Sequence, residues 1–232
     1  MSLNFIFSLC IVTLLHCAPL ESKDTIIVIN PAGDAHATGR IIGSTFERSI
    51  TLSWAHSIER ILTNLYPSLQ VIITRKAGDI LEPLHNASLA NRLNADFFLS
   101  LHAYHTTSPL PEIFFYFAQY DPEKDPLISQ HTNCRQQTFI PYHKAYTCAF
   151  NTSVLYSHTL YNHLLSQKSS KKIIAHTPIG IPCTPLIGIA VPACMIEVGI
   201  AVPELASSLP TLFVEALEKI VTIMYQKKNS HE

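Results

Sequence analysis

Five side chains that can bind a metal ion or move a proton stand at the ends of predicted elements. In chain order they are Asp34, His36, Glu47, His102 and Glu197. His102 and Glu197 close two apolar, strand-like runs, and the carboxyl ends of such strands face the ligand crevice of an open α/β sheet. Zinc hydrolases hold their metal through three His, Asp or Glu ligands and place a carboxylate nearby as a base. The set therefore has the chemistry of a zinc site, provided that the fold brings its members together.

Each of these residues also has a purely structural interpretation. Glu47 fits the last position of an S-x-x-E capping box and would then only cap its own helix. His102 would be a core histidine whose ring is hydrogen-bonded, and Glu197 would pair with an arginine such as Arg40 or Arg75. From the residues alone, the metal site and these structural roles both remain open.

The apolar pattern predicts the elements that position these side chains. Helical spacing predicts helices over 44–65, 86–93, 152–165 and 203–225, the last with a break at 210. Short apolar runs predict strands at 25–30, 71–74, 97–102, 113–118, 171–175 and 193–198. This alternation predicts an α/β fold, a three-layer α/β/α sandwich around a mixed, mostly parallel sheet of about six strands. The polar, aperiodic segment 121–149 is predicted to be an insertion over one edge of the domain.

Composition limits the classes of partner. Hydrophobic residues make up 47% of the 232 residues and charged residues only 14%, which favours one domain with a large core. The net charge of −1 gives no electrostatic basis for binding nucleic acid or an anionic membrane surface.

The N-terminus indicates export. Residues 1–18 have the pattern of a signal peptide, because the apolar stretch 5–15 is too short to span a bilayer. A buried N-terminal strand or helix is the alternative, and Cys17 follows His16, which makes a poor lipoprotein site. We therefore expect a mature domain over 25–228, periplasmic or extracellular, with a lipid anchor as an alternative form and no stable membrane span.

Six cysteines occur without any C-x-x-C pair, which argues against a structural zinc cluster. In an exported chain, a disulfide between Cys134 and Cys148 would staple the predicted insertion. Free buried thiols are the alternative.

The order of these segments resembles the zinc-dependent N-acetylmuramoyl-L-alanine amidases, which cut peptidoglycan. In that family a D-P-G-H-G-type turn is followed by a helix-opening Glu, then T-R, A-N, A-D-x-F-x-S-I-H-A and P-A-x-L-x-E-x-G. The matching segments here are Asn30–Asp34, Phe46–Arg48, Thr74–Arg75, Ala90–Asn91, Ala95–Ala103 and Pro192–Gly199. The histidine of the family's turn is absent, and the ungapped position is Gly33.

The resemblance implies a mechanism and its residues. It assigns as ligands of a Zn²⁺ ion Glu47, His102 and either Asp34 or His36. Glu197 would take a proton from the bound water and pass it to the leaving amine, and Arg75 and Asn91 would contact the substrate. The bond cut would join N-acetylmuramic acid to L-alanine in peptidoglycan.

Two other functions remain open because the turn histidine is missing. The chain would then be a degenerate amidase domain that binds cell wall without cutting it, or a zinc amidohydrolase that acts on another amide. The segment 121–149 would be a lid over the site or, as we expect, an inert edge cover, and no regulatory partner is identified by the sequence.

Overall fold

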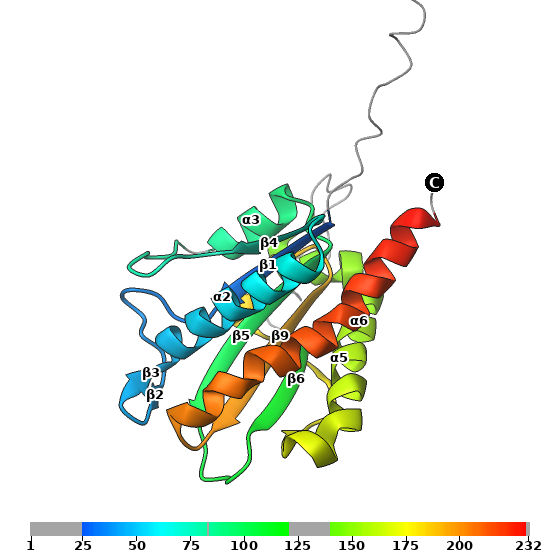
Figure 1. Ribbon diagram of the computed structural model, residues 1–232. Helices are drawn as coiled ribbons and strands as arrows, with labels where there is room; N and C mark the ends of the chain where they lie inside the picture. The colour runs from blue at the N-terminus through cyan, green and yellow to red at the C-terminus, as the bar shows by residue number, and fades with distance from the viewer. Residues whose placement is uncertain (1–24, 83, 121–139, 231–232) are drawn as a thin grey trace, which may run out of the picture.

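A mixed sheet forms the centre of the protein. The computed structural model describes residues 25–82, 84–120 and 140–230, and its main sheet has seven strands in the order β4-β1-β5-β9-β6-β7, with β8 also paired to β6. The strands are β1 (Thr25–Pro31), β4 (Leu69–Ile73), β5 (Phe97–His105), β6 (Glu112–Ala118), β7 (Ile174–Ala175), β8 (Ile179–Ile181) and β9 (Ala193–Ile200). β6 runs antiparallel to β9 and the other pairs are parallel (Figure 1), so the predicted mixed, mostly parallel sheet is confirmed.

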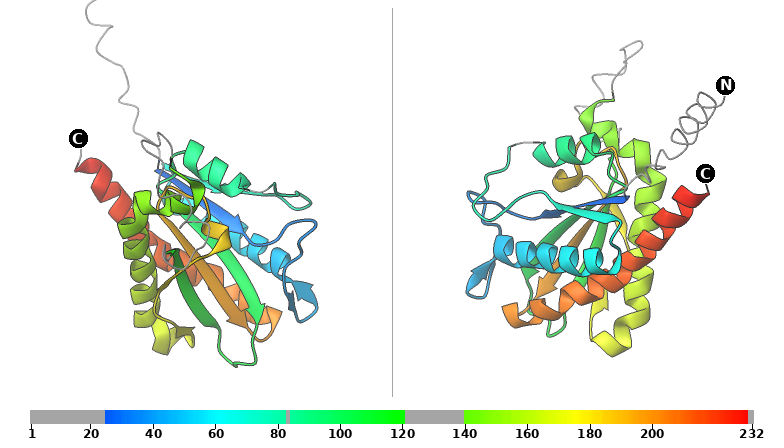
Figure 2. Two further views of the ribbon diagram at one scale, coloured as in Figure 1. Left: turned by 180° about the vertical axis from the view of Figure 1, so that it is seen from behind. Right: turned by 45° about the horizontal axis from the view of Figure 1, so that its top comes forward.

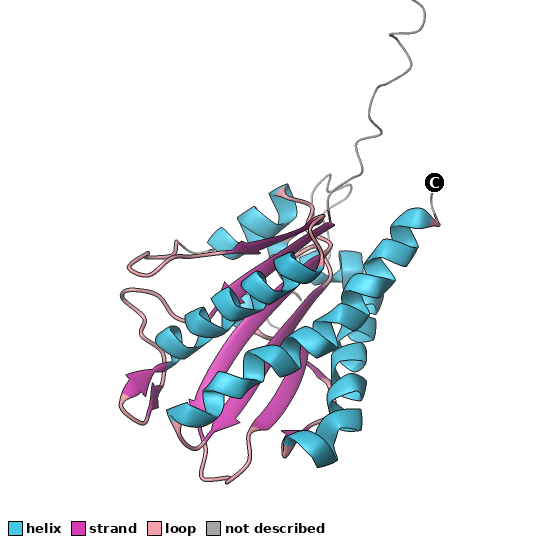
Figure 3. Ribbon diagram, in the orientation of Figure 1, coloured by secondary structure: helices cyan, strands magenta, loops and turns pink. Residues whose placement is uncertain are grey.

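Helices cover both faces of this sheet. Three long helices, α2 (Glu47–Leu65), α5 (Phe150–Lys171) and α6 (Leu209–Asn229), pack on one face, and α3 (His85–Arg92) lies on the other (Figure 2, right; Figure 3). Short helical turns at Tyr142–Ala149, Thr184–Leu186 and Pro203–Ser208 connect them. The arrangement is the predicted α/β/α sandwich. Among the described helices, none has an apolar stretch long enough to cross a membrane.

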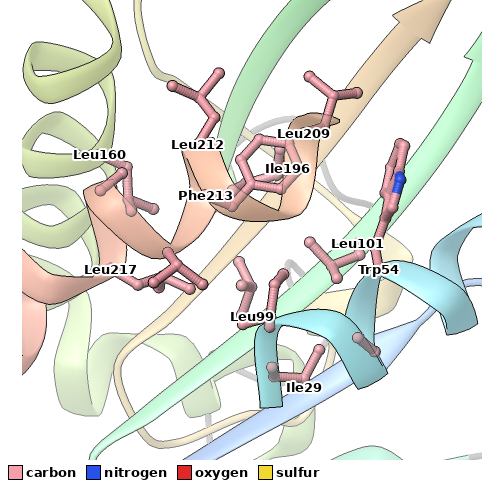
Figure 4. Packing of buried hydrophobic residues seen from close by; sticks show 14 of the residues in the cluster. Ile29, Trp54, Leu99, Leu101, Leu160, Ile196, Leu209, Leu212, Phe213 and Leu217 are labelled. Carbon is pink, nitrogen blue, oxygen red and sulfur yellow. The ribbon is translucent and has the colours of Figure 1, made fainter. Parts of the chain in front are cut away.

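The larger hydrophobic core lies between the sheet and the three long helices. Alternate strand residues such as Ile29, Leu99 and Ile196 point into it and meet Trp54 of α2 and Phe213 of α6 (Figure 4). The Trp54 and Phe213 rings pack edge to face, with centroids 6.0 Å apart. The Trp54 indole also donates a hydrogen bond of 2.8 Å to the carbonyl of Ala206. Burial of this apolar surface fixes the register of the strands and hence the positions of their carboxyl ends.

A smaller core lies under α3, on the opposite face. Val28, Phe98 and Met195 of the sheet pack there against Ala87 and Ala90. α3 covers only the first part of β5 and β9, and the left view of Figure 2 shows no described helix in front of their carboxyl ends. The polar residues of this face therefore lie outside the core, at the edge where a site was predicted.

Several element boundaries differ from the predictions. The helix predicted from 44 begins at Glu47, because Thr45–Phe46 (β3) pairs with Ile41–Ile42 (β2) in a two-stranded hairpin. The helix predicted over 203–225 is divided just before Pro210, into the 3₁₀ turn Pro203–Ser208 and α6 from Leu209, so the predicted break is confirmed. Pro210 lies in the first turn of α6, where a proline is well tolerated because its missing N–H has no helical partner. β2, β3 and β8 were not predicted, since strands of two or three residues show no periodicity.

Two predictions fall largely outside the described residues. The signal peptide at 1–18 and most of the insertion (121–139) cannot be compared with the structure. The remainder of the insertion is the helical turn Tyr142–Ala149, which leads into α5. Cys148 is a free, exposed thiol, and Cys183 and Cys194 are free and buried.

Candidate functional site

Glu47 and His102 form the centre of the candidate site. Glu47 opens α2, is only 4% exposed, and accepts a hydrogen bond of 3.1 Å from Nδ1 of His102 at the end of β5. Its two carboxylate oxygens also accept the backbone N–H groups of Ala103 and Arg40, each at 3.1 Å. Burial alone would raise the pKa of Glu47, but these hydrogen bonds outweigh it and lower that pKa, so the carboxylate is charged. Glu47 makes no capping-box bond, because its side chain points to β5 and to Arg40.

The second ring nitrogen of His102 belongs to a buried polar chain. Nε2 lies 3.1 Å from Oγ of Ser100, which accepts a hydrogen bond of 2.9 Å from the Asn30 amide. The Asn30 oxygen in turn accepts from Thr74 and Asn86 at 3.0 and 2.9 Å. The neutral tautomer with its proton on Nδ1 satisfies every bond, since Nδ1 then donates to Glu47 and Nε2 accepts from Ser100. Both ring nitrogens of His102 therefore have protein partners.

The loop after β1 folds directly over Glu47. Gly39 has a φ of +75°, and a Cβ built there would lie 2.6 Å from Oε2 of Glu47. Gly33, where the resemblance expects a histidine, has a φ of +74°, and its Cβ would lie 2.7 Å from the carbonyl oxygen of Ala37. The loop thus has a conformation in which no side chain fits at position 33 without a shift of the backbone.

Asp34 and His36, the alternative first ligands, take other positions. One carboxylate oxygen of Asp34 accepts the N–H groups of His36 and Ala37 at 2.8 and 2.6 Å, and the other accepts the N–H of Leu81 at 3.0 Å. The hydrogen bonds from Ala37 and Leu81 lower the pKa of Asp34. Its carboxylate therefore ties two loops together, and His36 is exposed. No hydrogen bond joins either residue to the Glu47–His102 pair among the described residues, although Asp34 lines the same cavity as His102.

Glu197, the predicted base, pairs with Arg40. Nη1 of Arg40 donates to Oε1 of Glu197 at 2.5 Å, and the Tyr116 hydroxyl donates to Oε2 at 3.3 Å. Burial would lower the pKa of Arg40, but Glu197 raises it, so the guanidinium stays charged. Burial together with Glu197 raises the pKa of Tyr116 to about 12. The structural interpretation considered from the sequence, an arginine partner for Glu197, is observed with Arg40.

His102 and Glu197 are neighbours in the sheet but line different cavities. They are register partners on β5 and β9. His102 lines a cavity of about 460 Å³ beside Asn30 and Asn86, whereas Glu197 lines one of about 430 Å³ with Arg40. The predicted convergence is thus partial, because the imidazole and the carboxylate do not share one pocket.

The two predicted substrate-binding residues, Arg75 and Asn91, are hydrogen-bonded to backbone groups. Arg75 is 4% exposed and donates to the carbonyls of Pro31, Ala32 and Arg48 at 2.9 to 3.1 Å. Asn91 donates to the carbonyl of Gly188 at 2.8 Å and accepts the N–H of Ala190 at 2.9 Å. Both side chains position loops around the site, and their contact with a substrate stays a prediction.

Comparison with known proteins identifies the family. The family model described as N-acetylmuramoyl-L-alanine amidase matches residues 27–209, which is most of the chain. The fold and the order of the site residues agree with this match. The chain belongs to the N-acetylmuramoyl-L-alanine amidase family.

Solved structures of amidases have the same fold. The catalytic domain of the amidase CwlV from Bacillus (Paenibacillus) polymyxa var. colistinus is 14% identical with a TM-score of 0.62, covering 85% of this chain and 98% of that one. AmiC2 of Nostoc punctiforme is 17% identical with a TM-score of 0.61, covering 87% and 97%. The CwlD amidase from Clostridioides difficile, solved in complex with the GerS lipoprotein, is 14% identical with a TM-score of 0.57, covering 90% and 100%. No curated protein matches the sequence.

Members of this family generally depend on zinc, but the residues present here do not fit a three-ligand zinc site. Within the described parts of the chain, no three His, Cys, Asp or Glu side chains are grouped so that they could hold a metal ion. Glu47 and His102 are adjacent, yet all of their acceptor and donor atoms already have protein partners. In the part of the chain that the structure describes, no third donor joins them, since Gly33 stands at the histidine position and Asp34 is bonded to backbone. The site therefore departs from its family in the set of groups that would hold the cofactor.

Proposed function

We propose that this chain is a peptidoglycan-recognition domain of the amidase family, which binds at the bond between N-acetylmuramic acid and L-alanine without cutting it by zinc catalysis. The proposal depends on the side chains that would have to bind the zinc ion. Glu47 and His102 are hydrogen-bonded to each other, the turn histidine is replaced by Gly33, and Asp34 is committed to the loop backbone. Family membership supports peptidoglycan as the ligand.

The state of Glu197 supports binding in the same way. A general base needs a free carboxylate oxygen within reach of the water that it deprotonates. Here one oxygen of Glu197 accepts from a charged guanidinium and the other from the Tyr116 hydroxyl. Both carboxylate oxygens of Glu197 are therefore engaged by protein donors.

Hydrolysis of the same amide bond is the second candidate function. It is favoured by the family match and by the position of Glu197 directly beside His102 on neighbouring strands. In a zinc-dependent amidase of this form, Glu47 and His102 would be two of the metal ligands and Glu197 the base. No third ligand is provided by the described residues, so this function requires another arrangement of the loop 31–40.

One incubation separates the two candidates. The purified chain is mixed with insoluble peptidoglycan in the presence of zinc, sedimented, and the wall is analysed for new L-alanine amino termini. We expect the protein in the pellet and no increase in those termini over a heat-treated control. Release of L-alanine amino termini, lost in Glu197→Gln, would establish the hydrolase instead. A chain that stays in the supernatant and releases nothing would refute both functions.

Export of the chain remains a proposal. The pattern of residues 1–18 would take the domain across the cytoplasmic membrane to the compartment that contains peptidoglycan. Fractionation of cells that express the full chain tests it, because a cytoplasmic protein of unprocessed mass would contradict export.

A further inference from the structure

The guanidinium of Arg40 is held in place but keeps donors to spare. Nη1 donates to Glu197, and the backbone N–H of the same residue donates to Glu47. The Tyr104 ring lies under the guanidinium, with 5.8 Å between Cζ and the ring centroid, at the distance of a cation–π contact. Within the described residues, Nε and Nη2 of Arg40 have no hydrogen-bond partner, and the side chain is 53% exposed. The one N–H of Nε and the two N–H groups of Nη2 are therefore available to a ligand.

Arg40 lines an open cavity. The cavity has a volume of about 430 Å³, and its other lining residues are Ile41, Tyr104, His105 and Glu197. Ile41 is 68% exposed and Tyr104 presents a ring, so apolar surface surrounds the charged fork. A pocket that combines apolar walls with a few fixed polar groups is typical of a small-ligand site.

The charges around this cavity select the kind of acceptor. Glu197 lines the cavity beside Arg40, and Glu112 accepts a hydrogen bond from the Tyr104 hydroxyl. The buried carboxylate of Glu47 accepts the backbone N–H of Arg40. These carboxylates offset the positive charge of Arg40, which disfavours an anionic ligand. A neutral oxygen acceptor, such as an amide carbonyl, meets the free N–H groups of Arg40 without this repulsion.

We propose that Arg40 binds an amide carbonyl oxygen of the muramoyl unit of peptidoglycan, and that Glu197 is the positioning residue that holds the guanidinium for it. The inference rests on the proposed function, because that function identifies the ligand as peptidoglycan. The resemblance assigns Glu197 the role of a base, whereas this proposal gives it the role of orienting the Arg40 guanidinium. Arginine is suited to this task because its planar fork keeps free N–H groups when one side is fixed by a carboxylate.

The test measures binding of a soluble probe, N-acetylmuramoyl-L-alanine amide, by titration calorimetry. Arg40→Ala is expected to bind about 10- to 100-fold more weakly, as follows from losing a hydrogen bond to a charged group worth roughly 1.5–3 kcal/mol. Arg40→Lys keeps the charge without the fork and should bind with intermediate affinity. The matched control is Arg60→Ala, an exposed arginine of α2 away from the cavity, which should bind as the unchanged protein does. N-acetylglucosamine as a second probe shows whether the acetamido carbonyl alone is enough or the lactyl carbonyl is needed.

The role of Glu197 is tested through Arg40. Glu197→Gln should weaken binding in the unchanged protein and have no further effect in the Arg40→Ala background, since it acts only by positioning Arg40. Equal binding by Arg40→Ala and the unchanged protein would overturn the inference while leaving the proposed function intact. A full loss from Glu197→Gln in the Arg40→Ala background would show that Glu197 contacts the ligand itself. Failure of the unchanged protein to sediment with peptidoglycan would instead refute the proposed function.

Discussion

Replacing Glu47 by glutamine is the sharpest test of the candidate site, because the carboxylate accepts three hydrogen bonds with two oxygens. Glutamine has one oxygen, which can keep the bonds from His102 and Ala103. In the unchanged protein the backbone N–H of Arg40 donates to the second oxygen of Glu47 at 3.1 Å. In the variant this N–H would face the NH₂ group of the glutamine, which cannot accept a hydrogen bond. One charge-assisted bond is lost and two become neutral, which together cost about 2–4 kcal/mol of unfolding free energy.

The assay is equilibrium unfolding in urea at neutral pH, with thermal unfolding beside it. For a domain of this size, 1 kcal/mol corresponds to roughly 2–4 °C in Tm, so Glu47→Gln should lower Tm by roughly 4–16 °C. The control on the same helix is Glu59→Gln, whose exposed carboxylate only pairs with His56 at 3.3 Å. We expect a change within about 0.5 kcal/mol there. If Glu47→Gln proved no less stable than Glu59→Gln, the network described around Glu47 would be wrong.

Three further changes follow from the same structure. The pKa of Glu47 in the folded chain lies below its ordinary value of 4.5. The difference in unfolding free energy between the unchanged protein and Glu47→Gln should therefore be complete above pH 4.5 and should shrink as the pH falls through the lower pKa of the folded chain. A difference that stays undiminished in acid would contradict this. Gly39→Ala should lower the unfolding free energy in urea by about 1–3 kcal/mol more than Gly78→Ala does. Both glycines have a positive φ, but only at Gly39 would the new Cβ meet Glu47. Equal losses of stability in the two variants would refute this close approach. Leu217→Ala, a buried residue of α6 (Figure 4), should destabilise the fold by about 2–5 kcal/mol, and a loss below about 1 kcal/mol would show that the core is not packed as described.

The strand ends were predictable from the sequence because their signal is strong. The apolar runs that end at His102 and carry Glu197 are long enough to identify buried parallel strands, and parallel strands end at one edge. Glu47 was placed by the helical spacing that follows it. These three residues therefore meet near one another as the topology requires.

The loop between β1 and α2 was not predictable in the same way. Its sequence has no periodicity. The orientation of the Asp34 carboxylate depends on a hydrogen bond from the N–H of Leu81, which lies 47 positions later in the chain. The sequence left two arginine partners open for Glu197, and only the fold shows that Arg75 is buried beneath the loop while Arg40 reaches the carboxylate. Ser100 and Asn30 were missed, although Ser100 lies two positions before His102 and hence on the same face of β5.

The same distinction explains the departure from the family. A sequence motif records that a histidine is absent at Gly33, but not whether a neighbour replaces it. The structure shows how the neighbours are used instead: Asp34 holds the loop, and Arg40 places a fixed positive charge beside Glu197. The carboxylates of Asp34 and Glu197 are thus satisfied by protein groups.

Zinc content after equilibrium dialysis tests this account most directly. The purified full chain is dialysed against micromolar zinc and then against buffer, and the metal bound per chain is measured by emission spectroscopy, with Glu47→Ala and His102→Ala in parallel. We expect far less than one zinc ion per chain for the unchanged protein, and the same small amount for both variants. One zinc ion per chain that is lost in either variant would contradict it, and would establish a metal centre at the Glu47–His102 pair.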